Sequence, residues 1–297
     1  MKDIIVGVDG SPGSEAALDR AFLEAERTGQ PLRVVHAWTL PTWTGAGAGG
    51  TAYTMPLPDP AESRRWAKAI LDEIVEKALM RRTSCVAVTM TAEVHQGPAS
   101  QVLSRLSTDA ALLVVGGSGH GQLASALLGS ATTYLLHHAH SPVMVVPAGV
   151  PADRFARVVV GLDGSPSSQA AFRWALGTAR TLDCPLVAVH AWVISTPPIP
   201  IPYGSLPPQA TYEQDARTWL DGELLALLEG EEPTTVLRHV PYGHTAGALL
   251  DETGPDDLLV IGSRGRGGFA SLLLGSVAIQ CATHATSPVV VLTEPRS

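Results

Sequence analysis

A glycine-rich loop that follows an apolar run occurs twice in the sequence, and its backbone is suited to binding an anion. In the first copy, Leu112–Val115 leads into Gly116 and Gly119, and a Gly-Ser pair follows at Gly129 and Ser130. Closely spaced glycines let backbone N–H groups face a ligand, and the first N–H groups of a helix have no partner within that helix. The pattern predicts a phosphate site at the end of a buried strand.

The second copy has the same spacing. Leu258–Ile261 leads into Gly262 and Gly265, and Gly275 and Ser276 follow at the same interval. A single copy is explained equally well by an ordinary strand-to-helix connection, because glycine marks many turns. Two copies with matched spacing favour a pair of nucleotide sites.

An aspartate also ends an apolar run in each half of the chain. Asp9 and Asp163 are each followed by the tripeptide Gly-Ser-Pro. A carboxylate at the end of a strand can accept hydrogen bonds from ribose hydroxyls, whereas the same residues can simply turn the chain and cap the next helix. Recurrence in register with the glycine loop favours ligand contact, and the two roles are compatible.

Other motifs for chemistry are missing from the sequence. It contains no GxxxxGK[ST], GxSxG or HExxH, and the dinucleotide fingerprint fails because the glycines follow a late strand. His137, His138 and His140 form a cluster, but neighbouring histidines on a helix point in different directions, so a solvated helix end is favoured over a metal site. No catalytic residue is predicted, and no metal ligand is identified.

The repeat extends through the whole chain. Asp9 recurs as Asp163, and His36–Trp38 recurs as His190–Trp192 at the same separation. This pattern indicates that one domain was duplicated. We expect the following segments: a nucleotide-binding domain at 1–147, a linker at 148–157 and a second such domain at 158–297.

Apolar periodicity alternates between strand and helix within each half. This alternation predicts an α/β fold of two tandem doubly wound domains, each a mostly parallel sheet with helices on both faces. Ligands then bind at the carboxyl ends of the strands. In the first half, the predicted strands are Asp3–Val8, Leu32–Ala37, Val86–Val94, Leu112–Val115 and Val143–Val146, and the predicted helices are Ser14–Thr28, Ala61–Arg82, Ser100–Ser107 and Ser130–Ala139.

Composition limits the class of protein. The chain has 297 residues, of which 45% are hydrophobic and 16% charged, as in a compact globular protein. A net charge of -8 argues against nucleic acid and anionic membranes as partners. Cys85, Cys184 and Cys281 form no CxxC, and no apolar segment approaches the roughly 20 residues of a membrane helix. We therefore expect a cytoplasmic protein with reduced thiols and no membrane insertion.

With the Asp-Gly-Ser strand end, the His-Ala-Trp strand and the glycine loop each present twice, the chain resembles the universal stress protein family, in its tandem ATP-binding form. The resemblance implies a five-stranded α/β sheet in each half and ATP as the ligand, with or without Mg²⁺. It further implies pairing through the last strand of each half. Here Val143–Val146 and Val289–Leu292 would pair within one chain, and two chains would form a homodimer.

The resemblance also implies a role for each matching residue. Asp9 and Asp163 would contact ribose, and the backbone of Ala37 and Ala191 would read adenine. The residues flanking the nucleotide would be Val115, Gly116, Ile261 and Gly262. The residues holding the phosphates would be Gly119, Gly129, Ser130, Ala131, Gly265, Gly275, Ser276 and Val277.

The two predicted sites differ in charge. Arg264 and Arg266 of the second loop align with Ser118 and His120 of the first. Two permanent cations predict tighter ATP binding at the second site near neutral pH. In the alternative, both arginines point to solvent and contribute little.

These features favour a regulatory protein of the stress response, in which ATP occupancy orders the loops and alters contact with a protein partner that the sequence does not identify. The alternative is an enzyme, a slow ATPase or nucleotidyl transferase that uses Asp9 or Asp163 to hold a metal ion. A structural dimerisation module with vestigial sites is a weaker third interpretation.

Overall fold

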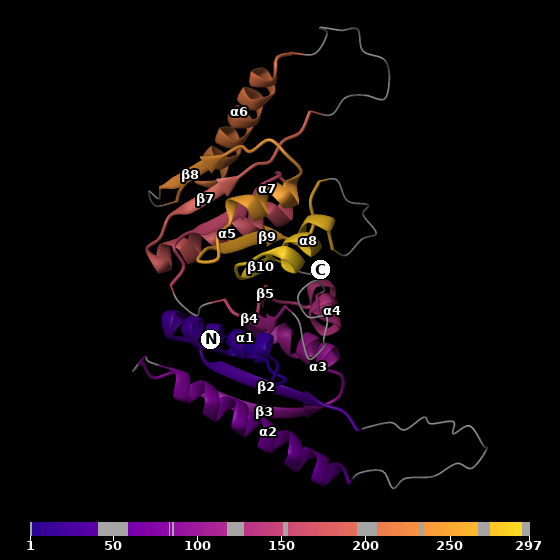
Figure 1. Ribbon diagram of the computed structural model, residues 1–297. Coiled ribbons are helices and arrows are strands. Elements are labelled where there is room, and N and C mark those ends of the chain that lie inside the picture. The colour runs from indigo at the N-terminus through magenta and orange to yellow at the C-terminus, as the bar shows by residue number, and fades with distance from the viewer. Residues whose placement is uncertain are drawn as a thin grey trace, which may run out of the picture.

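The computed structural model describes residues 2–40, 59–82, 84, 86–117, 128–150, 154–194, 207–231, 235–266 and 274–292. These residues form one ten-stranded sheet covered by helices on both faces (Figure 1). The strand order is β3-β2-β1-β4-β5-β10-β9-β6-β7-β8, so strands β1 to β5 fill one half of the sheet and β6 to β10 the other. The predicted doubly wound α/β fold is confirmed, and its two halves share a continuous sheet.

The first half alternates strands and helices as the apolar periodicity predicts. Its third strand begins at Met90 rather than at Val86, because its neighbour begins at Leu32 and Leu32 is paired with Met90. The elements are β1 (Asp3–Gly7), α1 (Pro12–Thr28), β2 (Leu32–Trp38), α2 (Pro60–Arg81), β3 (Met90–Gln96), α3 (Ala99–Leu106), a short 3₁₀ turn (Ser107–Asp109), β4 (Ala110–Gly116), α4 (Ser130–His138) and β5 (Val143–Val146).

The second half repeats this order. Its helices α5 and α6 take the places of α1 and α2, and α7 and α8 take those of α3 and α4. The elements are β6 (Val158–Gly161), α5 (Pro166–Leu182), β7 (Leu186–Val189), α6 (Gln209–Leu227), β8 (Val236–His239), α7 (Thr245–Glu252), β9 (Leu258–Gly262), α8 (Ser276–His284) and β10 (Val289–Leu292).

The two halves meet through β5 and β10, as the family resemblance implies. All other strand pairs are parallel, whereas β5 and β10 are antiparallel, with Met144 opposite Val290. Both strands consist of apolar residues that are buried on both faces, which suits the centre of a covered sheet. Because the junction is antiparallel, the carboxyl ends of the strands lie at one edge in the first half and at the opposite edge in the second.

Each face of the sheet has its own apolar core. Successive strand residues point to opposite faces, so Ile4 and Val6 join one core and Ile5 joins the other. Helices α1, α2, α5 and α6 cover the first face, where Phe22 and Phe172 are fully buried, and α3, α4, α7 and α8 cover the second. Among the described helices, none combines the length and apolarity needed to cross a bilayer.

Candidate functional site

A turn stabilised by an aspartate follows the first strand of the second half. The Oδ1 atom of Asp163 accepts a hydrogen bond of 2.9 Å from the backbone N–H of Ser165, and the hydroxyl of Ser165 accepts one of 3.2 Å from the N–H of Ser168. The serine therefore caps α5, and proline at the first helical position fixes the entry of the chain. The aspartate shapes the turn, and its carboxylate also lines a cavity described below.

The first half builds the same turn from the same residue types. The Oδ1 atom of Asp9 accepts a 2.9 Å bond from Ser11 N–H, and Ser11 Oγ accepts a 3.2 Å bond from Ser14 N–H. Equal distances in both halves show that Asp-Gly-Ser-Pro specifies this geometry locally.

One backbone hydrogen bond closes each glycine loop at its base. The N–H of Gly129 donates to the carbonyl of Gly117 over 2.8 Å, and the N–H of Gly275 donates to the carbonyl of Ser263 over 2.7 Å. Gly129 and Gly275 are also the N-caps of α4 and α8, and glycine has no side chain with which to cap. The first N–H groups of both helices are therefore suited to an anion.

The glycine at the end of β9 has a packing role that the sequence pattern does not reveal. A Cβ atom on Gly262 would lie 2.6 Å from Oγ of Ser167, and one on Gly116 would lie 2.5 Å from the carbonyl carbon of Gly13. Glycine at these two positions lets the first turn of α5 or α1 pack directly against the strand end. In the second half Asp163 lies beside the glycine loop, since a Cβ atom on Gly265 would lie 2.5 Å from its Oδ2 atom.

A cavity of about 820 Å³ opens at the carboxyl edge of the second half. It brings together most of the site residues predicted there, and it also includes Thr245 and Leu249 of α7, which no motif indicates. Ala191 is half-buried beyond β7 and does not contribute to the lining. The predicted residues in the lining are Asp163, Ile261, Gly262, Gly265, Gly275, Ser276 and Val277.

The predicted residues of the first half gather at the opposite edge of the sheet. They lie after β1, near the ends of β2 and β4, and at the start of α4. Their counterparts in the second half occupy the same places in the topology. Gly119 lies outside the described residues, as do Ser118 and His120. The predicted residues that the structure describes are Asp9, Ala37, Val115, Gly116, Gly129, Ser130 and Ala131.

Arg266 lies beside Asp163 at the mouth of the cavity. Its backbone N–H donates to Oδ2 of Asp163 over 2.9 Å, and its Nη2 donates to the carbonyl of Gly164 over 3.4 Å. The guanidinium rests 5.6 Å from the ring centroid of Trp219 on α6. The side chain is exposed, but these contacts hold its charge near the cavity.

Hydrogen bonds determine the charge of the aspartate. Burial raises the pKa of Asp163, but donors from Ser165, Arg266 and Ser168 outweigh burial, so the pKa lies below its ordinary value. The carboxylate is therefore ionised at neutral pH and acts as a hydrogen-bond acceptor.

His190 is held in a neutral form nearby. Its Nδ1–H donates to the carbonyl of Leu162 over 2.8 Å, and its ring packs against Trp219 at a centroid distance of 4.0 Å. Burial lowers the pKa of His190, and this effect is larger than the increase caused by the hydrogen bond to the carbonyl of Leu162. His36 makes the same 2.8 Å bond to Val8 in the first half. The two histidines thus fix the ends of β1 and β6, and Trp219 packs on His190.

The remaining histidine cluster lies at the end of α4. The ring of His138 packs against Tyr134 at 4.2 Å, and burial lowers the pKa of His137. In the part of the chain that the structure describes, no three His, Cys, Asp or Glu side chains are grouped to hold a metal ion.

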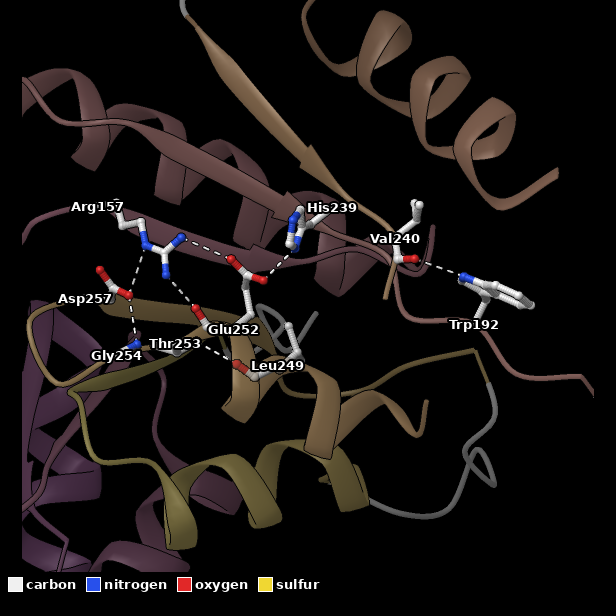
Figure 2. Close-up of polar contacts among 9 residues, drawn as sticks. All are labelled: Arg157, Trp192, His239, Val240, Leu249, Glu252, Thr253, Gly254 and Asp257. Carbon is white, nitrogen blue, oxygen red and sulfur yellow. Dashed lines mark hydrogen bonds and ion pairs between the residues drawn. The ribbon is translucent and has the colours of Figure 1, made fainter. Parts of the chain in front are cut away.

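An ion-pair network anchors α7, the helix that contributes Leu249 to the cavity (Figure 2). Arg157 donates through Nε to Asp257 over 3.1 Å and through Nη1 to Oε1 of Glu252 over 3.0 Å. Its Nη2 donates to the backbone carbonyl of Glu252 over 2.6 Å, at the end of the helix. His239 contacts the other carboxylate oxygen of Glu252 (Figure 2). A cation at a helix C-terminus also complements the helix dipole.

This geometry defines a tandem α/β protein with a cavity at the carboxyl edge of its second sheet half, formed by a glycine loop and the N-termini of α5, α7 and α8. The sequence profile of the Universal stress protein family matches residues 1–147 and 154–293. The chain belongs to this family, as its motifs predict.

Similar proteins agree with this assignment. A universal stress protein of Mycolicibacterium smegmatis is 35% identical over 295 residues, covering 97% of this chain and 96% of the relative. Universal stress protein Rv2623 of Mycobacterium tuberculosis is 34% identical over 307 residues, covering 98% and 96%. The crystal structure of a universal stress protein from Archaeoglobus fulgidus aligns with a TM-score of 0.69 at 18% identity and covers 98% of both chains. The last comparison supports the fold alone.

Proposed function

We propose that the chain binds one ATP molecule in each half and that nucleotide occupancy regulates its contact with a partner protein in the stress response. The observation that carries this proposal is the cavity of about 820 Å³ beside Asp163. Its volume lies within the roughly 300–1,000 Å³ of small-molecule sites. The N-terminus of α8 opens onto it through Gly275 and Ser276, which suits a phosphate.

The lining offers groups that match the phosphates and the ribose, and an apolar side chain beside the nucleoside. Gly265, Gly275 and Ser276 offer backbone donors to the phosphates. The ionised carboxylate of Asp163 accepts hydrogen bonds from ribose hydroxyls, and the apolar Ile261 flanks the nucleoside. In the same proposal, the backbone of Ala191 and of Ala37 recognises adenine. Any Mg²⁺ would enter bound to the triphosphate.

The same proposal covers domain organisation and assembly. Residues 1–147 and 158–297 form two ATP-binding domains joined by the linker 148–157. Two chains associate as a homodimer in the cytoplasm. A net charge of -8 supports a protein partner rather than nucleic acid.

The ligand that accompanies the purified protein tests the proposal. The full-length chain is isolated without added nucleotide, and the released small molecules are identified by mass spectrometry, followed by calorimetric titration with ATP and Mg²⁺. We expect adenine nucleotide at up to two molecules per chain. Intact ATP persisting for hours supports sensing, whereas rapid multiple turnover supports an ATPase. Failure to bind any adenine nucleotide overturns the proposal.

Variants of the two aspartates separate the sites. Asp9→Ala leaves the second site intact, and Asp163→Ala leaves the first. We expect the Asp9→Ala protein to bind ATP more tightly, because Arg264 and Arg266 belong to the second loop. Equal residual affinity in the two variants rejects the difference between sites and leaves ATP binding itself unaffected.

A further inference from the structure

Large apolar side chains are exposed on α2, the outer helix of the first half. Trp66, Ile70 and Met80 are 67%, 43% and 75% exposed. The helix lies at one end of the molecule, beside the edge strand β3 (Figure 1). Another side of it packs on the sheet through buried residues such as Leu71 and Ala78. A single exposed apolar residue is common, but several on one helix face mark an interaction surface.

The exposed apolar residues share one face of α2 with two charged residues, and together they form what we call the α2 stripe. The stripe consists, in chain order, of Trp66, Ile70, Glu73, Lys77 and Met80. Successive members lie four, three, four and three positions apart. This is the spacing of the a and d positions in a coiled coil, which keeps successive residues on the side of the helix that faces a partner helix.

An exposed ion pair forms the centre of the α2 stripe. The Nζ atom of Lys77 lies 2.7 Å from Oε1 of Glu73, and the two side chains are 57% and 65% exposed. Such a pair contributes little to the stability of its own helix. An ammonium group has three donors and a carboxylate has two acceptor oxygens, so each group can also bind an opposite charge on a partner.

The α2 stripe is complementary to a second copy of itself in an antiparallel arrangement. When Glu73 lies opposite Lys77 of the second copy, the opposed chain directions place Ile70 opposite Met80 of that copy. A two-fold axis then repeats both contacts. Parallel helices would instead bring Glu73 to Glu73 and Lys77 to Lys77, which is unfavourable. The charges at the centre therefore select the antiparallel arrangement.

Helix α6 occupies the place of α2 in the second half but does not carry this stripe. Its buried Leu220 corresponds to the buried Leu71 of α2. This alignment puts Asp215 and Glu229 at the apolar ends of the stripe, and a glycine and an alanine at the central ion pair. A helix can thus cover the sheet at this place without the stripe, so packing within the chain does not account for it.

We propose that the α2 stripe binds the α2 stripe of a second chain, so that the two helices form an antiparallel pair across a two-fold axis. This inference rests on the homodimer of the proposed function and identifies the surface through which that homodimer forms. Ile70 contacts Met80 of the second copy, and Trp66 covers the ends of the contact, as aromatic residues often do at interfaces. The cavity beside Asp163 includes no residue of α2, so it stays accessible in the dimer.

Charge reversal tests the proposed pairing. Glu73→Lys produces a stripe with two cations, and Lys77→Glu produces one with two carboxylates. Sedimentation equilibrium of the full-length chain should show a dimer, and each variant alone should have a dimer dissociation constant at least about tenfold higher, because like charges face each other. An equimolar mixture of the two variants should dimerise as the unaltered chain does, since each cation then meets a carboxylate. The double variant Glu73→Lys/Lys77→Glu should also dimerise.

The matched control uses an exposed ion pair with the same spacing on α6. Arg217→Glu places two carboxylates together there, because Arg217 is paired with Glu213, and it should leave dimerisation unchanged. The proposal is overturned if the unaltered chain is monomeric at every concentration, if the single variants dimerise as it does, or if their mixture does not.

ATP titration of the same proteins separates this inference from nucleotide binding. A monomeric chain that binds ATP would overturn the dimer surface and leave the nucleotide sites standing. A dimer that responds to charge reversal as described but binds no ATP would support the surface and overturn the nucleotide sites.

Discussion

The backbone N–H of Arg266 donates a hydrogen bond of 2.9 Å to Oδ2 of Asp163, although the two residues are 103 positions apart. This bond ties the loop after β9 to the turn after β6. It also holds the exposed guanidinium of Arg266 over Trp219, at the mouth of the cavity. A nucleotide that enters the cavity therefore approaches a positive charge whose position is already restricted.

Replacement of Arg266 tests how much this charge contributes. Arg266→Met, made in the Asp9→Ala background so that only the second site is measured, should weaken ATP binding roughly tenfold, since a charged hydrogen bond contributes roughly 1.5–3 kcal/mol and exposure reduces it. Affinity should also become less sensitive to salt. Isothermal titration at two salt concentrations provides the measurement. Arg217→Met is the control, and an affinity that does not change with Arg266→Met contradicts the role.

The parts of the fold that depend on local sequence were predictable. Buried parallel strands such as β4 are continuous apolar runs. The turn at Asp9 is formed by residues that are close in sequence, because the Asp9 carboxylate accepts its hydrogen bond from Ser11. Their boundaries therefore agree with the structure to within a few residues. The strand that shifted, β3, is an edge strand whose start depends on where its neighbour Leu32 lies.

Contacts between distant residues could not be predicted from spacing. Arg157 contacts Glu252 and Asp257, which lie 95 and 100 positions further along the chain. None of these three residues belongs to a recognisable sequence motif. Leu249 lines the cavity only because α7 crosses the sheet there. Ala191 follows the end of β7 at Val189 and lies outside the lining, so its contact with adenine stays a prediction.

The close approach at Gly262 makes a prediction about stability. A Cβ atom there would lie 2.6 Å from Ser167 Oγ, so Gly262→Ala must displace the first turn of α5. We expect a loss of about 1–3 kcal/mol in the free energy of unfolding, as for other overpacked sites. Urea denaturation measures it.

The matched control for Gly262 is Gly222, an exposed glycine within α6 with no atom near its Cβ direction. Gly222→Ala should stabilise the protein by about 0.5–1 kcal/mol, because alanine favours the helix. If both substitutions stabilise the chain, the packing explanation for Gly262 is wrong.

The buried thiol of Cys281 predicts a dependence of stability on alkaline pH. Burial raises the pKa of Cys281 to about 12, whereas the pKa of a thiol in the unfolded chain is about 8.5. Above that lower value the unfolded state loses its proton and the folded state keeps it, so the folded state is penalised as pH rises. The expected loss is about 1.4 kcal/mol per pH unit, starting above roughly pH 8.5 and ending near the folded pKa.

Comparison with Cys281→Ala isolates this contribution. The substitution lowers stability at every pH through the cavity it creates, but it should remove the extra slope between pH 9 and pH 10 in urea denaturation. Val291→Ala, in the same core, creates a cavity without removing a titrating group and should keep the slope. Parallel pH profiles for the unaltered chain and Cys281→Ala would show that the thiol is not buried as described.

The anchoring of α7 by Arg157 predicts coupling between stability and ligand affinity. Glu252 and Asp257 have side chains that are 15% and 6% exposed, so Arg157→Met leaves two largely buried carboxylates without their guanidinium partner (Figure 2). We expect the free energy of unfolding to fall by about 2 kcal/mol, between the effect of an exposed pair and that of a fully buried one.

Because Leu249 lies on the same helix and lines the cavity, ATP affinity at the second site should also fall. Arg217→Met, which breaks an exposed pair, should change stability by less than about 0.5 kcal/mol. A destabilised Arg157→Met protein whose two sites retain full affinity would show that α7 is held in position at the cavity by its apolar contacts alone.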